Sequence, residues 1–189
     1  MRSMARASGL FLLTLAVATA SPSVLAQAKD VASQQQIKRG QYLVQFGGCN
    51  DCHTPKSMTP KGPALDESLL LSGYRAGTPV PTVPSGVLGP TQWGALTNGD
   101  LTAWAGPWGI SFAANLTPDK STGLGDWTYA QFSQTMRKGK HLGTGRDLLP
   151  PMPWMSVAVL NDADMRALFA YLRSIKPVAN RVPAPIPPK

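Results

Sequence analysis

A helical alternation of apolar and polar residues marks the first ordered part of the chain. Over residues 33–46 (SQQQIKRGQYLVQF) the apolar side chains recur among polar ones in a broadly helical rhythm, and Ser33 can cap the first turn. Gly40 lies in the interior of this pattern, where glycine costs about 1 kcal/mol of helix stability relative to alanine. We therefore predict a helix that uses Gly40 for close packing.

Two further helices are predicted in the second half of the chain. Thr128 can cap a helix over residues 129–138, which Gly139 would end. Asn161 can cap the clearest helix, DADMRALFAYLRSIK (residues 162–176), whose acidic first turn and basic last turn suit the helix dipole. Its apolar side chains form one stripe, made of Met165, Leu168, Phe169, Leu172 and Ile175.

Between these helices, residues 54–110 are rich in glycine and proline and keep no period. A loop of this length is unusual inside a compact domain unless it has a function, and its tryptophans argue against a flexible linker. The pattern predicts an all-α domain over residues 27–176 with an inserted Gly/Pro-rich loop at about 66–105. The Pro-rich tail, residues 177–189, is expected to be extended and mobile.

The first 26 residues have the layout of a secretory signal. Arg2 and Arg6 precede a short apolar run, and Val24-Leu25-Ala26 resembles a cleavage site. The alternative is an uncleaved membrane anchor, which the short and interrupted apolar run makes the weaker interpretation. We expect an exported, soluble, periplasmic protein with no stable membrane insertion after cleavage.

The distribution of charged residues argues against one class of partner. The 189-residue chain has a formal net charge of +8 at pH 7, which favours acidic partners or surfaces. Its basic residues form no block with interleaved aromatic residues, so we predict no nucleic-acid binding.

The chain has only two cysteines, Cys49 and Cys52, in the sequence GGCNDCH. Cys-x-x-Cys-His is the attachment sequence of c-type haem, in which two thiols add to the vinyl groups and the adjacent imidazole binds iron. A disulfide or a thioredoxin-type dithiol would suit export, but that fold places a strand before the motif, and here a helix precedes it. A structural zinc site needs four ligands, and His141 could supply only one more. One covalently attached haem c, with His53 on the iron, is the best interpretation.

The sixth position of the iron separates an electron carrier from a haem enzyme or gas-binding protein. Met152 lies in LLPPMPW, where flanking prolines stiffen the backbone and exclude a helix. We predict Met152 as the second axial ligand. Met155, His141 and an open position remain as alternatives.

The order of these features resembles class I c-type cytochromes. The segment from Gly106 to Ser174, with NLTPD, TGLG and LLPPMPW, is similar to single haem domains of the cytochrome c subunits of periplasmic alcohol, aldehyde and sugar-acid dehydrogenases. The resemblance implies a cytochrome c fold in which residues 115–119 and 122–125 wrap the haem and Met152 is the axial ligand. It also implies that the first and last helices cross at Gly40. The Pro63 carbonyl would accept the imidazole N–H of His53.

The resemblance has limits, because such subunits typically carry three haem motifs and a membrane-binding end, whereas this sequence has one CxxCH. The implied function is a monohaem one-electron carrier between a periplasmic dehydrogenase and a higher-potential acceptor, and not an enzyme. A haem enzyme or gas-binding protein is the alternative, and a dedicated dehydrogenase subunit that docks through its inserted loop is another. Candidate propionate partners are Asn115, Trp108, Trp127 and Arg75. A basic docking rim could be formed by Lys56, Lys61, Arg137, Lys138, Lys140 and Arg146.

Overall fold

The computed structural model describes residues 22–188 and shows a mixed α/β chain, so the all-α prediction was wrong. These residues form five α-helices and two antiparallel sheets. The helices are α1 (Pro22–Phe46), α2 (Cys49–His53), α3 (Tyr129–Lys138), α4 (Trp154–Ala158) and α5 (Asp162–Ser174), with short 3-10 turns η1 (Glu67–Leu69) and η2 (His141–Gly143). Most of the predicted signal peptide, residues 1–21, lies outside the described residues.

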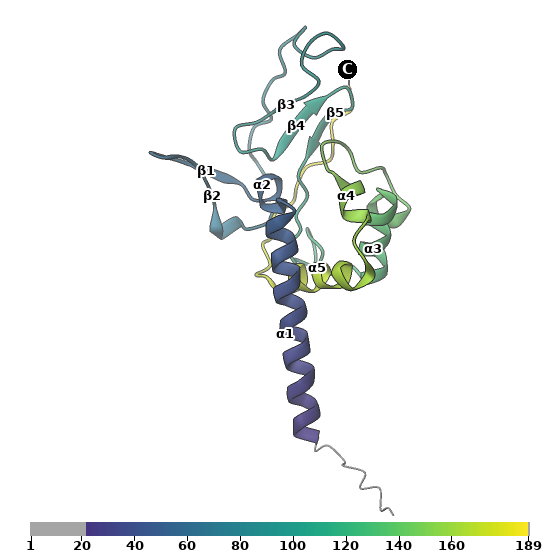
Figure 1. The fold of residues 1–189 in the computed structure, drawn as a ribbon. Coiled ribbons are helices and arrows are strands. Elements are labelled where there is room, and N and C mark those ends of the chain that lie inside the picture. Colours follow the sequence, from purple (N-terminus) through teal and green to yellow (C-terminus); the bar gives the residue numbers. More distant parts are fainter. Residues whose placement is uncertain (1–21, 189) are drawn as a thin grey trace, which may run out of the picture.

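The two sheets follow each other along the chain. The first pairs β1 (Lys56–Thr59) with β2 (Gly62–Leu65), and this hairpin projects from the body of the molecule (Figure 1). The second has the order β3 (Leu96–Thr97), β4 (Ala103–Gly106) and β5 (Gly109–Phe112). In the β4–β5 hairpin, Gly106 pairs with Gly109, whose φ of +91° suits glycine. The Gly-Pro-Trp-Gly stretch thus forms a turn between strands inside the segment predicted as a loop.

The predicted helix caps are confirmed at two helices. Thr128 and Gln131 form a capping box at the start of α3, and Gly139 ends that helix in the left-handed conformation. The Asn161 side chain accepts a hydrogen bond from the Asp164 N–H at 2.8 Å at the start of α5. Helix α1 differs from its prediction, because it begins at Pro22 instead of near Ser33. No glycine or proline interrupts it before Gly40, and proline is tolerated in a first helical turn.

Helices α1 and α5 cross at Gly40, as predicted. A Cβ atom on Gly40 would lie 1.9 Å from the backbone oxygen of Ala167 and 2.7 Å from Cβ of Tyr171. Beside this crossing, Arg39 Nε donates to Asp164 Oδ1 at 2.7 Å. Glycine is therefore required at this contact, and an ion pair flanks it.

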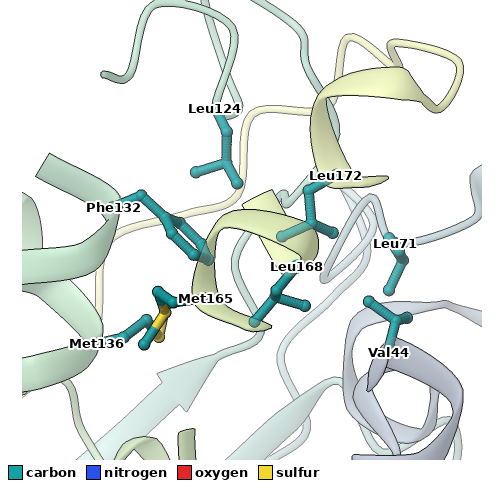
Figure 2. Close-up of a cluster of buried hydrophobic side chains, with 8 residues drawn as sticks. All are labelled: Val44, Leu71, Leu124, Phe132, Met136, Met165, Leu168 and Leu172. Carbon is teal, nitrogen blue, oxygen red and sulfur yellow. The ribbon is translucent and has the colours of Figure 1, made fainter. Parts of the chain in front are cut away.

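The hydrophobic core gathers around α5. Leu168 and Leu172 of α5 lie between Phe132 of α3 on one side and Val44 of α1 on the other (Figure 2). The buried cluster consists of Val44, Leu71, Leu124, Phe132, Met136, Met165, Leu168 and Leu172. Met136 and Met165 thus fill the core, as methionines on apolar helix faces commonly do.

The inserted segment is ordered, and its two ends lie next to each other in the fold. The Tyr74 N–H donates to the Ala113 carbonyl at 2.9 Å, and the Ala113 N–H donates to the Thr102 carbonyl at 2.8 Å. Residues 75–101 therefore leave the body of the fold and return to it beside Ala113. Leu71 and Tyr74, just before this excursion, are 0% and 1% exposed.

The Pro-rich tail is extended, as predicted, but hydrogen bonds hold it against the body, contrary to the expectation of a mobile tail. Ile186 and Ile110 exchange two backbone hydrogen bonds of 2.8 and 2.9 Å. Nearer α5, the buried side chain of Asn180 donates to the carbonyls of Ser72 and Tyr74. The tail is thus attached to both the inserted segment and the second sheet.

Candidate functional site

Two adjoining cavities between the helices and the second sheet form one cleft. They contain about 970 and 1320 Å³ of empty space, each opening to solvent. Both are lined by a shared set of residues: His53, Phe112, Ala114, Leu116, Arg146, Leu148, Met152 and Pro185. His53 and Met152 lie 99 positions apart in numbering, yet the fold brings both to this cleft. Its mostly apolar lining, with a few polar side chains such as His53 and Arg146, is typical of a cofactor site.

The two cysteines line the first cavity from the short helix α2. Gly48 precedes this helix in the left-handed conformation (φ +64°), which turns the chain between α1 and α2. The two thiols are not joined in a disulfide. Burial raises the pKa of the Cys49 thiol to about 11, and burial also raises that of Cys52. A redox dithiol needs an attacking cysteine of lowered pKa, so these thiols do not resemble such a site.

His53, the last residue of α2, is 8% exposed. Its Nδ1 atom lies 2.8 Å from the carbonyl oxygen of Ala114. A carbonyl only accepts, so the contact requires the tautomer in which Nδ1–H donates and Nε2 keeps its lone pair. Burial lowers the pKa of this imidazole, although the Ala114 hydrogen bond opposes that effect. The neutral imidazole is the form that binds metals.

The acceptor of this hydrogen bond corrects one expectation. Pro63 was expected to accept the imidazole N–H, but it lies exposed in the projecting hairpin, as part of β2. Ala114 takes that role from the segment after β5. A backbone carbonyl has no side-chain signature, so no signal in the sequence could have identified it.

Met152 lines both cavities and packs against the hydrophobic core. Its segment is tied to the second sheet, because the Ser111 hydroxyl donates to the Pro150 carbonyl at 2.5 Å. Ser111 was not singled out from the sequence. Its place in the β4–β5 hairpin is visible only in the structure, because these strands lie in a segment that the sequence predicts as a loop.

The other candidates for the second axial ligand lie in different places. Met155 is on α4, 59% exposed, and lines neither cavity. His141 lines the second cavity, where its ring meets Trp127 edge-on at 5.2 Å between centroids. Burial, and then the charge of Arg146, lower the pKa of His141. Met152 lines both cavities and Met136 and His141 line the second, so the choice of Met152 as axial ligand stays a prediction.

Of the four residues suggested as propionate partners, two line the cleft and two do not. Asn115 and Trp127 line the second cavity, but the Asn115 amide donates to the Val178 carbonyl at 2.8 Å. Arg75 pairs with Asp66 at 2.9 Å and lines neither cavity. Trp108 also lies outside the lining and donates to Ser111.

The six residues suggested as a basic docking rim do not all lie at the cleft. Arg146 alone among its members lines the cleft. Lys140 pairs with Asp147 at 2.6 Å, and Lys56 donates to the carbonyls of Asp51 and Asp100. Lys140 and Lys56 are therefore engaged by other groups of the protein, and the docking role of the rim stays a prediction.

Neither a preformed metal cluster nor a membrane span is found in the described part of the chain. Within residues 22–188, no group of three or more His, Cys, Asp or Glu side chains is arranged to hold a metal ion. Among the described helices, none combines the length and the apolar character needed to cross a bilayer.

Comparisons with known proteins agree with the resemblance noted from the sequence. The chain is 32% identical over 166 residues to the gluconate 2-dehydrogenase cytochrome c subunit of Pantoea cypripedii, covering 87% of this chain and 29% of the relative. It is 29% identical over 161 residues to the cytochrome c subunit of alcohol dehydrogenase (quinone) from Gluconobacter oxydans, covering 85% and 26%. It is also 28% identical over 148 residues to the fructose dehydrogenase cytochrome subunit of Gluconobacter japonicus, covering 78% and 23%.

The chain therefore spans less than a third of the length of each of these relatives. No protein-family model matches it.

Proposed function

The chain is a homologue of the cytochrome c subunits of bacterial dehydrogenases, and from this premise we propose that it is a periplasmic monohaem c-type cytochrome that carries single electrons. The observation that supports this most strongly is the joint placement of His53 and Met152 in one cleft, with the two cysteines at its edge. Residues 27–176 are the proposed cytochrome domain, preceded by a signal peptide over residues 1–26.

The residues of the cleft fit a c-type haem. Cys49 and Cys52 would form the two thioether bonds from one short helix, and Nε2 of His53 would bind the iron. The Ala114 carbonyl fixes the imidazole orientation and raises its basicity as a ligand. The thioether of Met152 would complete the coordination. The haem would supply a one-electron Fe(III)/Fe(II) couple.

The protein around this site holds the two proposed ligand residues in place. His53 is fixed by the Ala114 carbonyl, and the Met152 segment is fixed by Ser111. Methionine ligation raises the reduction potential of a haem. We therefore place the protein between a dehydrogenase, which donates electrons, and an acceptor of higher potential.

Absorption spectra of the oxidised and reduced protein test this function. We expect a low-spin haem spectrum with the weak far-red band of iron–methionine ligation, and no carbon monoxide binding by the reduced protein. Met152→Ala should abolish the far-red band and allow carbon monoxide to bind. Met155→Ala, which changes a methionine outside the cleft, is the matched control and should keep the band.

Each result has a defined meaning. A band that survives in Met152→Ala shows that another side chain is the axial ligand, and His141 is the next residue to change. Prompt carbon monoxide binding by the unaltered reduced protein would instead favour the haem enzyme or gas-binding protein. Absence of a covalent haem spectrum would overturn the proposal.

A further inference from the structure

The Pro-rich tail forms one wall of the cleft. Arg181, Val182, Pro183 and Pro185 line the second cavity, and Pro185 also lines the first. We call residues 178–188 the strap. We propose that the strap closes the edge of the cleft opposite the cysteines and that its Arg181, together with Arg146, binds the haem carboxylates. This inference rests on the proposed haem site.

The strap is anchored at its first end by a network of buried polar groups. The Asn180 side chain is 7% exposed; its amide donates to the carbonyls of Ser72 and Tyr74, and its oxygen accepts the Ala76 N–H at 2.9 Å. The Asn180 N–H in turn donates to the Thr122 hydroxyl at 3.1 Å. These bonds set the direction in which the next residue, Arg181, leaves the anchor.

The second end of the strap is anchored to β5. Ile186 and Ile110 exchange two backbone hydrogen bonds. A Cβ atom on Gly109 would lie 2.0 Å from the Ile186 oxygen, so the strap lies directly on the backbone of the sheet. Between the two anchors, Pro183 and Pro185 have no N–H groups that would need partners inside an apolar cleft. The strap therefore suits a wall that faces an apolar ring.

The charges along the cleft point to an anionic group. The side chains that carry a full positive charge and line the cavities are Arg146 and Arg181, and none of the described lining residues is Asp or Glu. Arg146 lines both cavities, whereas Arg181 lines the second cavity, which lacks the cysteines. In haem, the carboxylates lie on the edge opposite the vinyl groups. Arg181, which lines only the cavity without the cysteines, thus lies on the side where those carboxylates would be, and Arg146 borders both cavities.

A guanidinium at this edge would have two effects. It would form charge-assisted hydrogen bonds with a carboxylate, which are stronger than neutral ones. Its positive charge would also favour the reduced haem, whose iron carries one positive charge less. The reduction potential should therefore depend on the charge at position 181.

Redox titration of the haem-loaded protein tests the role of Arg181, with Lys176→Gln as the matched control. Lys176 is an exposed cation just after α5 and lines neither cavity. At the midpoint potential of the unaltered protein, Arg181→Gln should lower the ratio of reduced to oxidised haem roughly threefold, as expected for loss of a partly screened unit charge. Lys176→Gln should change it by less than half that factor.

Arg181→Lys separates the effect of the positive charge on the reduction potential from the effect of the guanidinium geometry. It keeps the positive charge without the guanidinium fork, so it should restore most of the ratio lost in Arg181→Gln. Equal ratios in Arg181→Gln and the unaltered protein would overturn the proposal, and so would equal losses in Arg181→Gln and Arg181→Lys.

The spectra distinguish this failure from failure of the proposed function. If Arg181→Gln keeps the far-red band and its titration is unchanged, the haem site stands and the role of the strap is refuted. If the unaltered protein shows no haem spectrum, the proposed function fails first.

Discussion

Replacing Asn180 by alanine should destabilise the protein strongly, although this residue lies in a Pro-rich tail. The substitution removes three side-chain hydrogen bonds, to the carbonyls of Ser72 and Tyr74 and from the Ala76 N–H. Ser72 and Tyr74 are 0% and 1% exposed, so their carbonyls cannot easily gain water instead. Ala76 is exposed, and its N–H can be solvated.

The magnitude follows from this difference in burial. A net hydrogen bond contributes about 1 kcal/mol, and a buried group left without its partner costs about 1–3 kcal/mol. In Asn180→Ala two buried carbonyls lose their donor, whereas water can replace the partner of the Ala76 N–H. The free energy of unfolding should therefore fall by about 3 kcal/mol. For a domain of this size, that loss lowers the melting temperature by about 6–12 °C.

Urea unfolding of the haem-loaded protein, followed by far-ultraviolet circular dichroism, measures this loss. Lys176→Ala is the control, because an exposed substitution away from such contacts should stay within about 0.5 kcal/mol of the parent. If Asn180→Ala also stayed within that limit, the hydrogen bonds of Asn180 would not hold the tail in solution, and the reasoning would be refuted.

Asn180→Asp gives an independent check through its pH dependence. An ionised carboxylate would face the two carbonyl oxygens that now accept from the amide, so folding would favour the protonated acid and raise its pKa. A group with a raised folded-state pKa stabilises at low pH and loses that contribution as the pH rises. The variant should therefore lose stability, relative to the parent, between about pH 4 and pH 7.

Two other predictions concern the crossing of α1 and α5. Gly40→Ala should lower the free energy of unfolding by about 1–3 kcal/mol, although alanine has the better helix propensity, because its Cβ would meet the Ala167 oxygen. Gly94→Ala is the control, because a Cβ at that position meets nothing within 4 Å. Equal urea midpoints for the two variants would contradict the packing argument. The Arg39 hydrogen bond holds the pKa of the Asp164 carboxyl below its ordinary value, so its contribution to stability is present above about pH 4 and lost as the pH falls through the lowered pKa. Asp164→Asn should accordingly be less stable than the parent at pH 7 and approach it in acid, and a gap that stayed constant across this range would exclude the ion pair as the cause.

The sequence predicted those features that side chains determine locally. Thr128 and Asn161 cap the helices where expected, and Gly40 makes the close contact that its place inside a helix indicated, at the crossing that the family resemblance implied. Cys49, Cys52, His53 and Met152 were chosen from their spacing and their proline neighbours, and the fold brings all four to one cleft. Their roles as cofactor ligands stay predictions.

The features that were missed depend on backbone groups or on residues far apart in the chain. The Ala114 carbonyl supports His53, a role that any residue type could provide. The β4–β5 hairpin lay hidden in a Gly- and Pro-rich stretch, because its strands of four residues are too short to show a period. The tail is predicted to be mobile because the sequence near it does not reveal the partners of Asn180, which lie more than 100 positions earlier.

The excursion over residues 75–101 has a consequence for how such proteins can diverge. It leaves and rejoins the fold beside Ala113, so the two ends stay together whatever the length of chain between them. Lengthening a loop whose ends are already close costs little conformational entropy. Insertions and deletions in this region can therefore change the surface of the protein, while the backbone that supports His53 keeps its geometry.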